Sequence, residues 1–233
     1  MNSPALDPIF AYRWFDTVPA DELQRLASTG VQREYPAKAL LYRAGEPPRG
    51  VYGVLEGSFK IALTSRAGQE ATVTVVGDGG WLGEAALFEG EPYLANCTAL
   101  RASRVLFLPG EALLAFCDRW PVVYRNLLQD ASEKLKQACW MSLQHMLRGP
   151  ELRLAYRLQI LPELLAADPL QEWVHLKNRL SHELLAQMLG LSRPRLSQAM
   201  KILELEGIVS GGHGHQQINR VRLDHYCSRA DHA

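Results

Sequence analysis

One segment near the C-terminus combines polar and basic side chains at helical spacing, a pattern suited to contacting a nucleic acid. In "SRPRLSQAMKIL" the apolar residues share one helix face, and these are Leu196, Ala199, Met200 and Leu203. The opposite face and its N-terminal flank carry Ser192, Arg193, Pro194, Arg195, Ser197, Gln198 and Lys201. Arg193 can donate two hydrogen bonds to guanine O6 and N7, Gln198 can pair with adenine or phosphate, and Lys201 suits phosphate. The pattern therefore predicts a helix whose polar face enters a DNA groove.

The residues before this helix complete the order expected of a helix-turn-helix. Ser181 can cap a first helix, whose inner side would carry Leu184, Leu185, Met188 and Leu189. Gly190 permits the tight turn, Ser192 can cap the second helix, and Pro194 is tolerated in its first turn. Helical hairpins in enzymes imitate this order, so it is only moderately specific by itself.

The segment after the second helix is more specific than the helix-turn-helix pattern alone. "EGIVSGGHGHQQINRVRLD" predicts a strand, a Gly-His loop and a second strand, which together form a wing. His213 and His215 lie in that loop, and two imidazoles alone make a poor metal site. We expect them to contact phosphate and expect no metal or other cofactor.

Composition and charge support a folded protein with two different halves. The chain has 233 residues, 47% of them hydrophobic, and a formal net charge of zero. Residues 1–120 hold 11 basic and 14 acidic side chains, whereas residues 173–222 hold seven and three. No apolar run approaches the length of a membrane span and the start does not resemble a signal peptide, so we expect a cytoplasmic protein with no membrane partner. Four scattered cysteines lack the spacing of a disulfide framework, a zinc site or an iron-sulfur cluster, and these are Cys97, Cys117, Cys139 and Cys227.

The N-terminal half reads as an antiparallel β-roll. From about 31 to 109, short β-branched and aromatic stretches alternate with glycine-containing turns roughly every ten residues. "PADELQRLAS" before it predicts a short helix. Together with the helices before and after it, this predicts an α+β protein: an N-terminal antiparallel roll or barrel, a long helix, and a C-terminal winged helix-turn-helix.

A long helix separates the two halves. From about 111 to 148 there is no internal glycine, and Pro121 stands where it could open the helix. One stripe at alternating four and three spacing carries Tyr124, Leu128, Ala131, Leu135, Ala138, Ser142 and His145. Such a stripe can pack on its own domain, but some 28 residues would span about 42 Å, and this excess length favours pairing with a second copy.

"RGP" at 148–150 ends the long helix and divides the chain. We expect a sensor domain over 1–118, the dimerisation and coupling helix over 119–149, and the DNA-binding domain over 150–233. Within the last domain, a helix over about 151–166 and a strand over 173–176 precede the helix-turn-helix.

The order of these parts resembles the catabolite activator/FNR (CRP/FNR) family of bacterial transcription regulators. The most specific segments are "YRAGEPPRGVYGVLEGSFKI", "GEAALFEG" and the Ser-Arg start of the second helix, and the resemblance extends over nearly the whole chain. It implies that the N-terminal β-roll is a cyclic-nucleotide-binding-like jelly roll and that the long helix is a dimerisation helix. It also implies a homodimer, not an enzyme, that binds double-stranded DNA at a two-fold symmetric site with half-sites about 34 Å apart. It places Arg193, Pro194 and Gln198 at base-reading positions and makes RNA polymerase a further candidate partner. Pro194 stands where family members frequently have glutamate, and Gln198 where they frequently have arginine. The operator sequence of the best-known members therefore cannot be assumed for this protein.

The same resemblance argues against cyclic AMP as the effector. Gly83 and Glu84 match the pair that holds ribose and phosphate, but Tyr93 and Leu94 stand where an Arg-Ser pair would grip the phosphate. On the long helix, Ala138 and Cys139 replace the hydroxyl pair that contacts adenine. Between Arg66 and Arg101 there is no basic residue but there are five acidic ones, so a phosphodiester would meet net repulsion.

Several readings of the sensor half stay open. It can bind a weakly charged organic ligand between Trp81, Tyr93 and the long helix, or bind nothing and serve as a dimer scaffold. A cyclic dinucleotide held through residues such as Arg49 or Arg104 is a third possibility. Haem, metal and triad chemistry are disfavoured, because no histidine precedes His145 and no GxSxG is present. From a different class, the chain could be a ligand-binding or interaction protein with a vestigial DNA-binding domain.

Overall fold

The computed structural model of the chain describes residues 7–68, 70–164, 172–175, 181–211 and 217–231. It divides into two compact units, Met1–Lys134 and Leu135–Ala233, which are treated separately below. The helix α5 (Val122–Leu147) crosses the division. Over the described part of the chain, no helix is long and apolar enough to cross a membrane.

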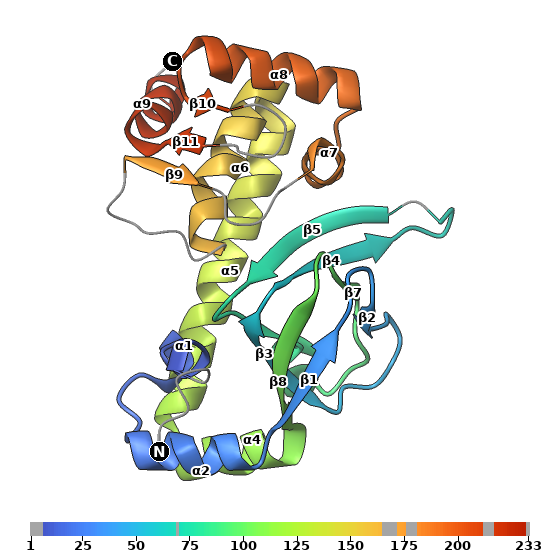
Figure 1. The fold of residues 1–233 in the computed structure, drawn as a ribbon, viewed down its shortest axis with the longest axis vertical. Coiled ribbons are helices and arrows are strands. Elements are labelled where there is room, and N and C mark those ends of the chain that lie inside the picture. Colours follow the sequence, from blue (N-terminus) through green and yellow to red (C-terminus); the bar gives the residue numbers. More distant parts are fainter. Residues whose placement is uncertain (1–6, 69, 165–171, 176–180, 212–216, 232–233) are drawn as a thin grey trace. The chain divides into compact units, whose positions relative to one another are not determined.

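The first unit is built on two antiparallel four-stranded sheets (Figure 1). One sheet has the order β1 (Val31–Tyr35), β8 (Ser103–Pro109), β3 (Gly50–Glu56) and β6 (Trp81–Leu82). The other has the order β2 (Leu40–Tyr42), β7 (Asn96–Ala99), β4 (Ser58–Thr64) and β5 (Glu70–Gly77). The predicted antiparallel roll is confirmed.

Short helices accompany the sheets of this unit. Before β1 come α1 (Asp7–Phe10), the 3-10 turn η1 (Arg13–Phe15) and α2 (Ala20–Ser28), which confirms the helix predicted from "PADELQRLAS". The helix α3 (Glu84–Glu89) follows β6, and α4 (Gly110–Arg119) follows β8. α5 begins directly after Pro121, as predicted, because a proline needs no helical N–H partner in the first turn.

Side chains of the β1-β8-β3-β6 sheet alternate between two cores. On β8, Leu106 and Leu108 join a cluster shared with α1, α2, α4 and the start of α5, here called the helix-side cluster. Val105 and Phe107, the alternate residues, join a cluster between the two sheets, here called the inter-sheet cluster. Because both faces of this sheet are covered, β3 is buried along six of its seven residues.

The second unit holds the remaining helices and a small sheet. In chain order it contains α6 (Pro150–Leu164), β9 (Trp173–His175), α7 (His182–Leu189), α8 (Arg193–Leu205), β10 (Val209–Ser210), β11 (Gln217–Asn219) and α9 (Arg220–Asp231). The three strands form one antiparallel sheet in the order β10-β11-β9. The α+β fold class is confirmed in both units.

One expectation about the wing is wrong. We expected the second strand to continue through "NRVRLD", but β11 ends at Asn219 and α9 begins at Arg220. The Asn219 side chain is buried, and its Oδ1 accepts a hydrogen bond from the backbone N–H of Arg222 at 3.0 Å. An asparagine in this position caps a helix, so it stops the strand and starts α9. The predicted loop contacts of His213 and His215 lie outside the described residues.

Candidate nucleic-acid interface and sensor cassette

The helix-turn-helix is formed by α7, a tight turn and α8. Ser181 caps α7, because its Oγ accepts from the backbone N–H of Leu184 at 3.1 Å. Gly190 ends α7 with φ of 58°, a left-handed conformation that glycine adopts without steric cost. The N–H of Leu191 then bonds to the carbonyl of Ala186 at 2.9 Å, which closes the turn toward α8.

The two faces of α8 have the predicted character. Its apolar residues are buried, and these are Leu196, Ala199, Met200 and Leu203. The residues predicted to contact DNA on α8 and its N-cap are exposed, and these are Ser192, Arg193, Pro194, Arg195, Ser197, Gln198 and Lys201. α8 therefore presents polar and basic groups on the face opposite its buried side, where a groove could receive them.

The predicted capping role of Ser192 is wrong in one respect. Ser192 occupies the N-cap position with extended φ and ψ, but its side chain makes no capping hydrogen bond. A cap side chain accepts from the second or third helical N–H, and Pro194 at the second position has none. The hydroxyl of Ser192 is exposed instead, where it can serve a phosphate.

The sequence reading missed a partner of Arg193. Its Nη2 lies 2.9 Å from Oε2 of Glu183 in the first turn of α7, and both side chains are mostly exposed. Exposed ion pairs contribute little to stability, so this one can open at low cost. The pair holds the guanidinium of Arg193 beside the N-terminal ends of both helices. Glu183 was counted only as a negative charge, and no spacing rule links it to Arg193.

In the first unit, Gly83 and Glu84 begin the short helix α3. Gly83 has φ of 92°, and a Cβ there would lie 3.2 Å from the carbonyl oxygen of Gly50. The position therefore favours glycine on two grounds, backbone conformation and close approach. It turns the chain so that the carboxylate of Glu84 reaches Nζ of Lys134 on α5, at 2.7 Å.

Tyr93 fills space inside the roll. Its ring stacks on Tyr42 with centroids 3.9 Å apart, and its hydroxyl donates to the carbonyl of Gly50 at 3.5 Å. Burial raises the pKa of the Tyr93 hydroxyl, so the group stays neutral. Tyr93 belongs to the inter-sheet cluster, whereas the following Leu94 is 83% exposed.

Trp81, the other aromatic residue of the expected pocket, lies in the helix-side cluster. Its indole N–H donates to the carbonyl of Ile9 at 2.9 Å, and its ring packs 5.3 Å from that of Trp14. The structure therefore places Trp81 and Tyr93 in separate clusters rather than on two sides of one cavity. Ala138 and Cys139 belong to the second unit, where both are exposed.

The residues of the predicted dimer stripe are exposed along α5. Within the first unit Leu128 is 69% exposed, and within the second Leu135 is 65% exposed. Tyr124, Ala131, Ala138, Ser142 and His145 are exposed as well. Each of these two leucines is an apolar side chain that its own unit leaves uncovered.

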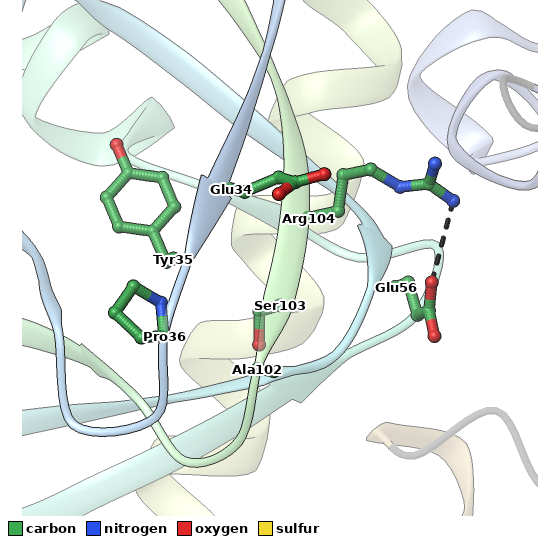
Figure 2. A pocket seen from close by; sticks show the side chains of 7 residues that line it. All are labelled: Glu34, Tyr35, Pro36, Glu56, Ala102, Ser103 and Arg104. Carbon is green, nitrogen blue, oxygen red and sulfur yellow. Dashed lines mark hydrogen bonds and ion pairs between the residues drawn. The ribbon is translucent and has the colours of Figure 1, made fainter.

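Arg104 lines a surface pocket of about 480 Å³ where β1 ends and β8 begins (Figure 2). The lining residues are Glu34, Tyr35, Pro36, Glu56, Ala102, Ser103 and Arg104. The guanidinium of Arg104 pairs with Glu56 at 3.5 Å, and Glu34 adds a second carboxylate. A phosphate ligand would have to displace one carboxylate and face another, so the charge here does not favour a cyclic dinucleotide. Arg49 is exposed in the loop before β3.

Two family models match the chain, one in each unit. Residues 32–119 match the cyclic nucleotide-binding domain, and residues 152–226 match the Crp-like helix-turn-helix domain. Together they cover well over half of the sequence. The winged helix-turn-helix described above lies in the second match, and the roll with its Gly83-Glu84 turn lies in the first.

Comparisons with whole proteins agree. The chain is 26% identical over 209 residues to the cyclic AMP receptor protein of Thermus thermophilus, covering 90% of this chain and 93% of the relative. The solved structure of FixK2 from Bradyrhizobium japonicum superposes with a TM-score of 0.73 at 20% identity, over 84% of this chain and 96% of that one. The c-di-GMP responsive regulator CLP of Xanthomonas campestris gives a TM-score of 0.68 at 19% identity, over 86% and 99%. By its two matched domains and their order, the chain belongs to the catabolite activator/FNR family of bacterial transcription regulators.

Proposed function

We propose that the protein is a homodimeric regulator that reads a two-fold symmetric promoter site and does not use cyclic AMP as its effector. The observation that carries DNA reading is the exposed polar face of α8, backed by the buried face that docks it on the rest of the domain. Arg193 at the first helical position is the residue best suited to a guanine, and Lys201 to the backbone.

The proposed dimer is supported by α5. Leu128 and Leu135 are both largely exposed and stand seven residues apart, the spacing that places side chains on one seam of a paired helix. Exposed leucines cost little individually, but a stripe of them on a helix of 26 residues is a surface suited to a second copy. A two-fold axis between two such helices would present two copies of α8 to two half-sites.

Independence from cyclic AMP is supported by the contacts of residues 81–97, here called the cassette. Glu84, whose counterpart holds a ribose in nucleotide-binding relatives, is paired with Lys134. Tyr93 turns inward to stack on Tyr42, and Leu94 offers no donor to a phosphate. A nucleotide would therefore have to break an ion pair and still find no cation placed for its phosphodiester among residues 67–100.

Selection from a random DNA library tests the reading of DNA. The wild-type chain is expected to enrich a palindrome, with affinity falling steeply as salt rises. Arg193→Ala removes one bidentate base contact of about 1–3 kcal/mol from each half-site, so it should weaken binding of the dimer to that sequence by roughly 30-fold or more and relax preference at one base pair of each half-site. Glu183→Gln is the matched control, because it releases Arg193 without removing it and should keep the sequence preference. A library that shows no enrichment would contradict the proposal and favour a vestigial DNA-binding domain.

Calorimetric titration tests the effector claim. Cyclic AMP at up to millimolar concentration is expected to produce no binding heat, because residues 67–100 offer the phosphate no cation and Glu84 is already paired with Lys134. Cyclic di-GMP, the ligand named for the Xanthomonas regulator, should be titrated in parallel. Micromolar binding of cyclic AMP that disappears in Glu84→Ala would show that the cassette still holds the nucleotide.

A further inference from the structure

Asp130 on α5 is a buried carboxylate with several donors around it. It is 4% exposed, and its oxygens accept from Nε1 of Trp14 at 3.0 Å and from the hydroxyl of Tyr12 at 3.1 Å. Nζ of Lys134, one turn along the helix, lies 2.9 Å away. Burial acts to raise the pKa of Asp130, but the bond from Trp14 and the charge of Lys134 outweigh it, and the pKa is lowered. Asp130 is therefore an ionised group inside the unit.

The ammonium of Lys134 has a second carboxylate and an aromatic face beside it. Its Nζ lies 2.7 Å from Oε1 of Glu84 and 5.8 Å from the centre of a Trp14 ring. An ammonium has three donors and is attracted to an indole face, so the two carboxylates and Trp14 satisfy it from different sides. Burial acts to lower the pKa of Lys134, but the charge of Glu84 and the bonds to Glu84 and Asp130 outweigh it. The ammonium stays charged.

These contacts join three parts of the first unit that lie far apart in the sequence. Trp14 and Tyr12 come from the N-terminal segment, Glu84 is the first residue of α3, and Asp130 and Lys134 belong to α5. Among these contacts, the ion pair between Glu84 and Lys134 is the one that connects α3 to α5. The ammonium thus sits where the cassette helix meets the long helix.

An ordinary surface ion pair is the simplest alternative, since the Lys134 side chain is 45% exposed. Its two acceptors are different: the Asp130 side chain is 6% exposed and that of Glu84 is 21% exposed. Without the ammonium, two partly buried carboxylates would remain close together, and the largely exposed guanidinium of Arg13, 3.7 Å from Asp130, would offset part of their charge. The arrangement is a preformed anionic site rather than two flexible chains meeting in solvent.

We propose that Glu84, Asp130 and Trp14 form a binding site for a primary ammonium group, and that Lys134 is its resident ligand, supplied by the chain itself. Occupancy of this site holds α3 on α5 in the absence of a diffusible effector. Where the proposal speaks of DNA binding it rests on the proposed function, whereas the binding of the ammonium itself does not. A chain whose lysine is shortened should accept a small alkylammonium ion in its place.

Chemical rescue of Lys134→Ala tests the site. The full-length variant should unfold at a temperature lower by about 3 °C or more. Its affinity for the selected operator should fall about fivefold, the lower end of typical coupling between sites. Addition of n-propylammonium chloride, which supplies the three missing carbons and the ammonium, should recover both quantities. Sodium chloride at the same ionic strength should not recover them, and the wild type should not respond to the amine.

Lys60→Ala is the matched control, because Lys60 also pairs with a glutamate of this unit, Glu70. That pair joins β4 and β5, which are already bonded along their length, so its loss should give no amine-dependent recovery. If Lys134→Ala does not fold, Lys134→Met keeps the apolar stem and should still unfold below wild type.

Two results would overturn the site: wild-type stability in either Lys134 variant, or recovery of Lys134→Ala by sodium chloride as complete as by the amine. A second arm adds Glu84→Gln to Lys134→Ala, and this double variant should bind the amine more weakly. Failure of the wild type to select any operator would count against the proposed function alone, since the unfolding temperatures still report on the ammonium site.

Discussion

Replacing Leu128 and Leu135 together with glutamate is expected to yield a monomer that no longer holds its operator. Both side chains are largely exposed in the single chain, so the change should leave the fold of each unit intact. In a dimer paired along α5, each glutamate would lie near its own copy across the two-fold axis, and like charges would replace apolar contacts. Light scattering after gel filtration measures the mass, and circular dichroism checks that the helices persist.

The same variant should lose most operator affinity, because a monomer can fill only one half-site at a time. Val31→Glu is the matched control: Val31 is also exposed and apolar, but it lies on β1 rather than on α5. It should leave both mass and affinity unchanged. A Leu128→Glu, Leu135→Glu protein that remains a dimer would place the interface elsewhere in the chain.

The helix-turn-helix could be predicted from the sequence because its determinants are local. The buried face of α8 follows from apolar residues at helical spacing, and the turn follows from a glycine that must adopt positive φ. The wing was harder, since Val221 and Leu223 alternate with arginines in a pattern typical of a strand. Asn219 caps α9, so the segment forms a helix instead. A single asparagine in a sequence is a weak signal of a helix start, because its burial and its hydrogen bond are not visible there.

The surroundings of Glu84 could not be predicted in the same way. Residues 67–100 contain acidic side chains and no cation, whereas the cation that pairs with Glu84 is Lys134, fifty residues further along the chain. The spacing of Asp130 and Lys134 was visible as a helical i,i+4 pair, yet nothing in the sequence says that it faces Glu84. The position of Trp81 in the sequence likewise predicts that it lies near a ligand. In the structure its side chain instead contacts Ile9 and Trp14.

The acid and alkaline limits of stability should reflect this cluster. The pKa of Asp130 is lowered in the folded chain, so its contribution is complete above the unfolded value of about 4 and is lost as pH falls through the folded one. The pKa of Lys134 is raised, so its contribution is complete below about 10.4 and is lost as pH rises further. Between these limits the cluster should stabilise the first unit at constant strength.

Asp130→Ala is expected to destabilise the first unit strongly. It leaves the buried indole N–H of Trp14 and the hydroxyl of Tyr12 without their acceptor, and it removes one of the two carboxylates around Lys134. Each buried donor left without an acceptor costs about 1–3 kcal/mol, whereas the ion pair with the 45% exposed Lys134 adds little, so the free energy of unfolding of the first unit should fall by a large share. Urea unfolding of the full chain, followed by tryptophan fluorescence, measures the change.

Asp118→Ala is the matched control, because Asp118 is exposed and accepts one bond, from Tyr124 at 2.8 Å. Its loss should cost about 1 kcal/mol or less, the net value of one ordinary hydrogen bond. Asp130→Asn should fall between the two, since its amide oxygen can still accept from Trp14 while the charge that faces Lys134 is gone. The free energy of unfolding of Asp130→Asn should also no longer show the decrease at acid pH that protonation of Asp130 causes in the wild type. Equal costs for Asp130→Ala and Asp118→Ala would mean that the buried carboxylate is no more than a solvated surface group, and the cluster could not then hold α3, the N-terminal segment and α5 together.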